Sequence, residues 1–274
     1  LCSLFQLSES TYYAQLRPKR IKLEERIMLT RIKSIAAETG STYGRRRMKT
    51  ALVREGFKLG VYRTVTLMKQ AKVQAIKPSR KHYYPNAGKA HLIAPNLLNR
   101  QFEPKQENTH WVGDITYIRT HQGWSYLACV LDLASKEIVG WAISKSPNAE
   151  LAKTALNHAI RRQQPDTSKL MFHSDQGVQY SAKLFTQHLI TLKITQSMSR
   201  RGNCWDNSVM ERFFRSLKSE RLNHLNFTHH AAVISTVESY LYFYNYKRLH
   251  SSIGYMTPST KNGKIEKIGL KLLH

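Results

Sequence analysis

Five segments after residue 108 show the residue pattern of β-strands. Apolar and polar positions alternate or form short apolar runs, β-branched and aromatic residues are frequent, and turn residues bound the segments. The first three follow one another through short connections, one of them around Gly123, and this arrangement predicts an antiparallel meander. The five segments are 110–120, 124–134, 137–144, 169–175 and 194–199.

Helical spacing of apolar residues fills the gaps between the later strands. Helices are expected at 148–163 and 181–192, and a third begins with Asp206 or Asn207 as its N-cap. Its apolar stripe consists of Val209, Met210, Phe213, Phe214 and Leu217. The resulting order, βββαβαβα, predicts an α/β fold in which helices flank a mixed sheet.

The first part of the chain is predicted to be helical throughout. Helices are expected at 21–38, 44–55 and 61–71. The Gly-bounded turn EGFKLG joins the last two, as in helix-turn-helix DNA-binding folds. Periodicity then fades and prolines recur, which indicates a linker. Four regions follow: a helix-turn-helix-like DNA-binding region (1–75), a linker (76–108), a core (109–225) and an aromatic and basic extension (226–274).

Charge is strongly unbalanced and points to a polyanionic partner. The chain has 43 Lys and Arg against 18 Asp and Glu, a net charge of +25, and +16 of this lies in residues 1–100. A membrane is disfavoured because no run of 18 apolar residues occurs. Nucleic acid is therefore the expected partner, and Arg45, Arg46 and Arg47 are candidate DNA contacts, with a solvated basic surface as the alternative.

The cysteines bear on the compartment. Cys2, Cys129 and Cys204 are odd in number and widely spaced, which indicates neither a disulfide framework nor a metal motif. We therefore expect a reducing, cytoplasmic location. The chain begins at Leu1 and not at a methionine, so an upstream, separately encoded portion is also expected.

Three carboxylates stand at informative positions. Asp114 lies inside a strand built for packing, Asp175 ends a strand before Gly177, and Glu211 lies on the last helix. A carboxylate on a half-buried strand face is unfavourable unless it is paired or binds a metal. Taken alone, Asp175 is equally well an ordinary turn residue. Taken alone, Glu211 is more simply a surface ion pair with Arg215.

Four motifs together change this interpretation. The stretches WVGDITYI, HSDQGVQYSA, MSRRGNCWDNSVMERFFRSLKSE and YNYKRLHSSIGYMTPS, in this order, resemble the DDE transposases of bacterial insertion sequences. The similarity is to the second-reading-frame (OrfB) product, which is related to retroviral integrases. It implies a ribonuclease H-like core in which Asp114, Asp175 and Glu211 are catalytic and bind metal. Lys218, seven residues after Glu211, matches the family's cation at that spacing.

The resemblance also implies chemistry and partners. The expected reaction is DNA strand cleavage followed by 3′-OH strand transfer, with two Mg²⁺ ions, for which Mn²⁺ can substitute. The expected partners are double-stranded DNA, further copies of the chain in a homo-oligomer on DNA, and the upstream-frame protein; the expected location is the bacterial nucleoid. The alternatives are a ribonuclease H-like nuclease without strand transfer and a non-catalytic DNA-binding regulator.

Several residues receive subsidiary roles. DNA contacts are expected from Lys218, Arg215, Lys247 and Arg248, the last two in a segment that interleaves aromatic and basic residues. His173 and Asn207 are candidates for the second shell of the site. A packed histidine is the alternative for His173, and a helix cap is the favoured role of Asn207.

Overall fold

The computed structural model describes residues 2, 5–6, 8–16, 22–76, 93–200 and 203–261. The chain divides into two compact units, Leu1–Ala75 and Ile76–His274. Most of the first half of the expected linker and the end of the C-terminal extension lie outside the described residues. Within the described ranges, no helix is long and apolar enough to cross a membrane.

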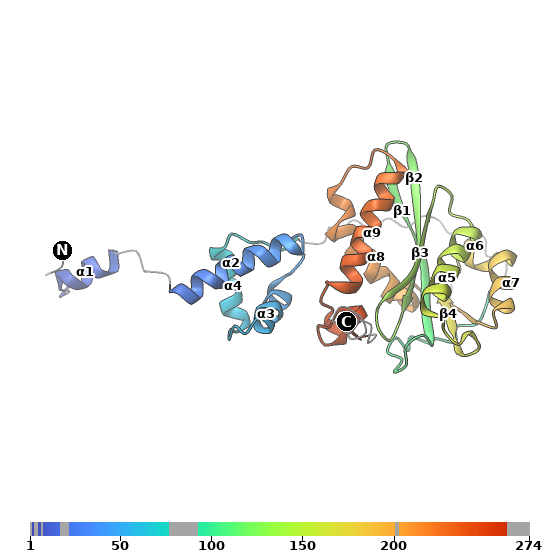
Figure 1. Ribbon diagram of the computed structural model, residues 1–274, viewed down its shortest axis with the longest axis horizontal. Helices are drawn as coiled ribbons and strands as arrows, with labels where there is room; N and C mark the ends of the chain where they lie inside the picture. Colours follow the sequence, from blue (N-terminus) through green and yellow to red (C-terminus); the bar gives the residue numbers. More distant parts are fainter. Residues whose placement is uncertain are drawn as a thin grey trace, which may run out of the picture. The chain divides into compact units, whose positions relative to one another are not determined.

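The N-terminal unit is helical, as predicted. Its helices are α1 (Glu9–Leu16), α2 (Leu23–Glu38), α3 (Arg45–Arg54) and α4 (Val61–Gln70). The last three share a small core to which each contributes fully buried side chains, including Ile32, Met48, Leu52 and Leu67. Between α3 and α4 the chain turns at Gly56, whose φ of +92° is a left-handed conformation that glycine adopts without strain. The fold of this unit is helix-turn-helix-like (Figure 1).

The second unit is built on a five-stranded mixed sheet, counted over the described residues. Its strands are β1 (His110–Thr120), β2 (Gly123–Asp132), β3 (Ile138–Ser144), β4 (Met171–Ser174) and β5 (Thr195–Met198). The sheet order is β3-β2-β1-β4-β5. The first three strands form the predicted antiparallel meander, while β4 pairs parallel to β1 and β5 parallel to β4.

Helices cover both faces of this sheet (Figure 1). On one face, α5 (Ala149–Gln163), α6 (Val178–Ser181) and α7 (Lys183–Thr191) pack on a core that includes Trp111 and Phe172. The other face carries α8 (Ser208–Glu220) and α9 (His230–Tyr246), followed by α10 (Pro258–Lys261). The single helix expected at 181–192 is thus two shorter helices that begin at Val178.

β3 and α5 approach each other very closely at Gly140. A Cβ atom at this position would lie 2.6 Å from the Ala159 Cβ and nearer still to the carbonyl oxygen of Ala155. Because these contacts are with helix backbone and a short side chain, no rotamer change relieves them. Gly140 therefore allows α5 to lie directly on the sheet.

The second half of the expected linker belongs to the core. Leu98 is 1% exposed. The backbone N–H groups of Leu97 and Leu98 donate to the Ser197 Oγ of β5, at 2.9 and 3.1 Å. An extended linker is therefore the wrong description for residues 93–100, which lie against β5 and which we call the strap.

Candidate active site

Parallel pairing brings Asp114 and Asp175 to the same place. Val112 of β1 is the register partner of His173 of β4. Asp114 and Asp175 are each two residues further along parallel strands, so their backbones emerge side by side where β4 ends. Beyond this point β1 continues to Thr120 without β4 beside it, which leaves room above the acids.

The two carboxyls influence each other electrostatically. Burial raises the pKa of the Asp114 carboxyl well above its ordinary value, and the nearby carboxylate of Asp175 raises it further. The side chain keeps part of its surface accessible and its Oδ1 accepts the Ile115 N–H at 2.7 Å. Burial also raises the pKa of Asp175, although a hydrogen bond from the Gly177 N–H, 3.0 Å, acts in the opposite direction. Lys218 is a basic side chain that acts on this pair, and it offsets the raised pKa of Asp114 only in part.

Glu211 and Lys218 complete the charge pattern around Asp114. Both lie on α8, and each acts on the pKa of Asp114, which Glu211 raises and Lys218 lowers, both less than Asp175 does. Burial lowers the pKa of Lys218, and Asp114 partly restores it. Glu211 is exposed, and no group of three His, Cys, Asp or Glu in the described ranges is close enough to hold a metal ion. Of the other two carboxylates, Asp175 therefore acts on Asp114 more strongly than Glu211 does.

Asn207 occupies the N-cap position of α8 but does not cap the helix. Its side chain makes no cap hydrogen bond, so the predicted capping role is wrong. Instead its Nδ2 donates to the carbonyl of Gly113 at 3.4 Å, next to Asp114, and its Oδ1 is buried without a hydrogen-bond partner among the described residues. The amide therefore ties the start of α8 to β1 beside the acidic pair.

His173 is a packed histidine. It is 1% exposed, and its ring nitrogens are hydrogen-bonded to the hydroxyls of Ser197, at 2.9 Å, and Ser199, at 3.2 Å. Burial lowers its pKa to about 4. The imidazole is therefore neutral near pH 7 and is held by β5, with both nitrogens engaged away from Asp175.

The expected DNA contacts fall into two groups. Arg215 and Lys247 are exposed, as are Arg45 and Arg46 of α3. Arg248, in contrast, is 4% exposed and forms a bidentate ion pair with Glu220, at 2.6 and 2.9 Å. Its guanidinium joins α9 to α8 and is not presented to DNA, so we correct that assignment.

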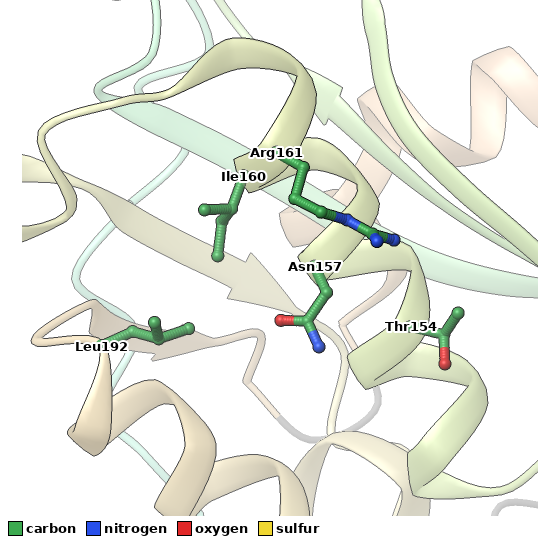
Figure 2. A pocket seen from close by; sticks show the side chains of 5 residues that line it. All are labelled: Thr154, Asn157, Ile160, Arg161 and Leu192. Atoms are coloured by element: carbon green, nitrogen blue, oxygen red, sulfur yellow. The ribbon is translucent and has the colours of Figure 1, made fainter.

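Described residues of the C-terminal unit line two cavities. A groove of about 560 Å³ runs from Lys218 along the end of β1, between Tyr117 and Thr120 on one side and Leu222 and Phe227 on the other. The second cavity, about 460 Å³, lies between α5 and the end of α7 (Figure 2), and no acidic residue lines it. The first is lined by Lys218, whose charge acts on Asp114.

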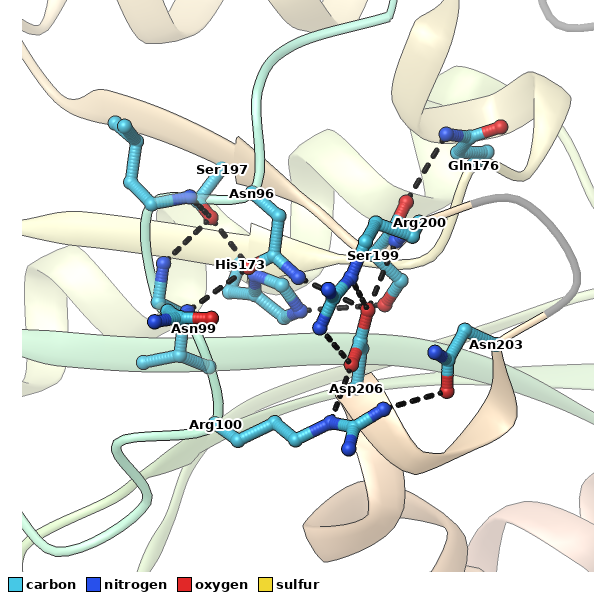
Figure 3. Close-up of polar contacts among 12 residues, drawn as sticks. Asn96, Asn99, Arg100, His173, Gln176, Ser197, Ser199, Arg200, Asn203 and Asp206 are labelled. Carbon is cyan, nitrogen blue, oxygen red and sulfur yellow. Dashed lines mark hydrogen bonds and ion pairs between the residues drawn. The ribbon is translucent and has the colours of Figure 1, made fainter.

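Sequence reasoning missed one charged cluster altogether. Asp206, expected only as a helix cap, is buried and is paired with Arg100 and Arg200 (Figure 3). No local pattern signals this cluster, because Arg100 is more than a hundred residues away in the sequence.

The sheet order, the flanking helices and the acids where β1 and β4 separate define a ribonuclease H-like integrase-core protein. Models of the Integrase core domain match residues 104–204 and 192–258, and an HTH-like domain matches 22–82. A 31 kDa protein of insertion element IS600 from Shigella sonnei is 36% identical over 94% of this chain and 96% of its own length. The transposase of IS904 from Lactococcus lactis is 33% identical over 88% and 96%. The chain belongs to the family of insertion-sequence transposases, and its function is DNA transposition by polynucleotidyl transfer.

More distant similarity extends to solved structures. The catalytic core domain of BIV integrase is 21% identical, with a TM-score of 0.44, and covers 60% of this chain and 99% of that one.

A further sequence relative is the transposase InsF of IS3A from Escherichia coli, which is 35% identical over 81% of this chain and 77% of its own length.

Proposed function

We propose that Asp114, Asp175 and Glu211 are the catalytic carboxylates of this transposase. The observation that supports the proposal best is the placement of Asp114 and Asp175 two residues beyond a parallel register pair, where the Asp175 carboxylate raises the pKa of Asp114. Two adjacent carboxylates repel each other and are costly to maintain unless a cation relieves them. The acids are therefore retained for chemistry and not for stability.

The donor set fits a hard divalent cation. Asp114 and Asp175 supply carboxylate oxygens, which Mg²⁺ prefers, and Glu211 lies on a helix whose approach would add a third. When bound, two such ions would activate the attacking oxygen and stabilise the leaving oxygen at phosphorus, with Mn²⁺ as a substitute. Asp114, whose pKa both other acids raise, would be one of the residues that hold these ions.

The remaining residues of the site act on DNA. The phosphates along one strand would contact Lys218 and Arg215, and the groove that begins at Lys218 would accommodate that strand. This contact holds the scissile phosphate in line with the attacking oxygen. In the first step water displaces the 3′ oxygen at an element end; in the second the freed 3′-OH attacks a target phosphate and displaces its 3′ oxygen. No protein nucleophile is required.

We propose that the N-terminal unit selects the DNA duplex. Arg45 and Arg46 are exposed at the start of α3, which the turn at Gly56 joins to α4 in the helix-turn-helix-like unit. A homo-oligomer on DNA, an upstream-frame partner and a nucleoid location are parts of the same proposal. Light scattering of the chain with and without element-end DNA tests the oligomer.

A strand-transfer assay tests the proposed function. The chain is incubated with labelled element ends, target DNA and Mg²⁺, in parallel with Asp114→Asn and with EDTA. We expect cleaved and joined products that disappear in both controls. Cleavage without joined product would instead identify a nuclease, and activity retained by Asp114→Asn would refute the assigned site.

A further inference from the structure

The strap ends in a buried ion cluster at the start of α8. The carboxylate of Asp206 is 1% exposed and accepts five hydrogen bonds from described residues (Figure 3). From the strap, Asn96 Nδ2 donates at 2.9 Å and Arg100 Nε at 2.8 Å. Arg200 donates its backbone N–H at 3.0 Å and its guanidinium at 3.1 and 3.3 Å. These guanidinium hydrogen bonds, from Arg200 above all, hold the pKa of Asp206 well below its usual range.

The strap is also fastened to the strand that leads to Asp175. Its Leu97 and Leu98 N–H groups share the Ser197 hydroxyl with the imidazole of His173, which lies two residues before Asp175. On the far side of Asp175, Gln176 Nε2 donates to the Ser199 carbonyl at 3.0 Å. The strap therefore contacts the start of α8 directly, through Asp206, and the end of β4 indirectly, through Ser197 and His173.

Asp206 is well placed to control where Glu211 lies. It precedes α8 by two residues and Glu211 by five, and its neighbour Asn207 contacts Gly113 beside Asp114. Because α8 is a continuous helix from Ser208, any shift at its start is transmitted to Glu211 as a rigid displacement. Glu211 acts on the pKa of Asp114 from the first turn of α8, so its approach to a cation held by the acidic pair depends on how firmly this start is held.

We infer that the strap is a positioning element, in which Arg100 and Asn96 act through Asp206 to set Glu211 relative to Asp114 and Asp175. The inference rests on the proposed function, because it assigns the strap's effect to the affinity of that site for divalent cations. Outer partners of this kind typically change metal affinity about 10–100-fold when they are removed. The strap residues themselves touch neither cation nor DNA.

Mg²⁺ binding to the full chain is the first measurement, by calorimetry without DNA. Asp206→Asn keeps the shape of the side chain but removes the anion that both guanidiniums share, and Arg100→Lys keeps the charge but loses the planar fork. We expect both variants to bind Mg²⁺ about 10–100-fold more weakly. The Mg²⁺ concentration for half-maximal strand cleavage should rise in parallel, with cleavage restored at high Mg²⁺. Amide hydrogen exchange of the first turn of α8 should be faster.

Glu137→Gln is the matched control. Glu137 is a fully buried acid in the same unit, paired with Arg162 at 2.7 Å on the α5 side of the sheet. The Glu137→Gln substitution should lower the melting temperature while leaving the affinity for Mg²⁺ unchanged. If Asp206→Asn also lowers only the melting temperature, the cluster is merely structural and the inference is refuted. Should Asp206→Asn not fold, Arg100→Lys and Asn96→Ala decide by the same criterion.

Failure of the proposed function gives a different result. In that case Asp114→Asn would bind Mg²⁺ as well as the parental chain does. A different pattern would refute the strap inference alone: Asp114→Asn loses Mg²⁺ binding, whereas Asp206→Asn and Arg100→Lys bind Mg²⁺ as the parental chain does.

Discussion

At the scale of single residues, the Asp114 carboxyl is held in an environment that disfavours its charge. It is surrounded by buried groups, among them the Cys129 thiol of the neighbouring strand, whose pKa burial and Asp114 both raise. Its nearest acid, Asp175, adds repulsion, and Lys218 compensates only in part. Metal-free protein therefore stores unfavourable electrostatic energy at this position.

The first prediction concerns pH in EDTA. A carboxyl with a raised folded pKa binds more protons in the folded state than in the unfolded state. Its contribution to the free energy of unfolding is therefore lost as pH rises from about 4, the ordinary carboxyl value, through the raised folded pKa. Asp114→Asn should remove this loss and stabilise the protein by about 0.5–2 kcal/mol at pH 7.

Chemical unfolding of both proteins from pH 4 to 8 measures the difference. Asp166→Asn is the control of opposite sign, because hydrogen bonds from Ser168 and Lys169 lower the pKa of exposed Asp166. That variant should be slightly less stable than the parent above pH 4. Equal pH profiles for Asp114→Asn and the parent would contradict the prediction.

The second prediction separates Glu211 from Lys218. Glu211→Gln preserves the shape of an exposed side chain on α8 but removes a hard anionic ligand. Cleavage and strand transfer should both fall by about 10²–10³-fold or more, with melting temperature and DNA-end binding maintained. Lys218→Ala should weaken end binding and slow the reaction less, because positioning is lost and the carboxylates remain. If Glu211→Gln transposes at a rate near that of the parent, Glu211 is a surface acid without a catalytic role and the prediction is contradicted.

At the scale of elements, the site depends on two strands that run parallel for a short distance. β4 pairs with β1 only over His110–Val112, and this brief pairing carries Asp175 to Asp114. The pairing is supported from behind by α5, which lies against the sheet because Gly140 has no side chain. Packing on one face of the sheet thus holds acids that act on the other.

The third prediction tests this support. Gly140→Ala introduces a Cβ into the backbone of α5, and overpacking of this kind costs about 1–3 kcal/mol. Differential scanning calorimetry should show a lower melting temperature for the C-terminal unit, while the transition of the N-terminal unit stays in place. If Gly140→Ala gives the same melting curve as the parent, α5 can move away from the sheet without loss of stability, and the prediction is contradicted.

At the scale of the whole molecule, the arginines of the N-terminal unit have different roles. The N-terminal unit holds its helices together partly by ion pairs, Arg31 with Glu55 and Arg63 with Glu25. Arg45 and Arg46 remain exposed, whereas Arg47 lies over the Tyr43 ring at 5.9 Å. The arginine triplet is thus divided between solvent and packing.

The fourth prediction follows from that division. Replacing Arg45 and Arg46 by Ala should weaken binding to all duplexes and reduce the slope of log affinity against log salt by about one unit per lost phosphate contact. Fluorescence anisotropy between 50 and 200 mM salt measures both quantities. Arg47→Ala serves as the comparison and should lower stability more than it lowers the slope. An unchanged slope in the double variant would place α3 away from DNA.

The sequence alone was sufficient for the strands and for most of the helices, although it predicted one helix where α6 and α7 form and did not predict α9. Alternating and helical patterns predicted the meander, both later strands, α8 and the helix-turn-helix pair, because such patterns report burial of one face of each element. It also singled out Asp114, Asp175 and Glu211 as candidates, because acids at strand ends and in motifs are local features. Their catalytic assignment stays a proposal.

Tertiary structure alone decided which charges meet. Arg248 was expected at DNA and is buried against Glu220, Asn207 was expected as a cap and reaches Gly113, and Asp206 is held by Arg100 of a segment interpreted as linker. Each of these outcomes depends on contacts between segments distant in the chain. Local patterns record how deeply an element is buried, but the partner of a buried charge is set only when the sheet brings those segments together.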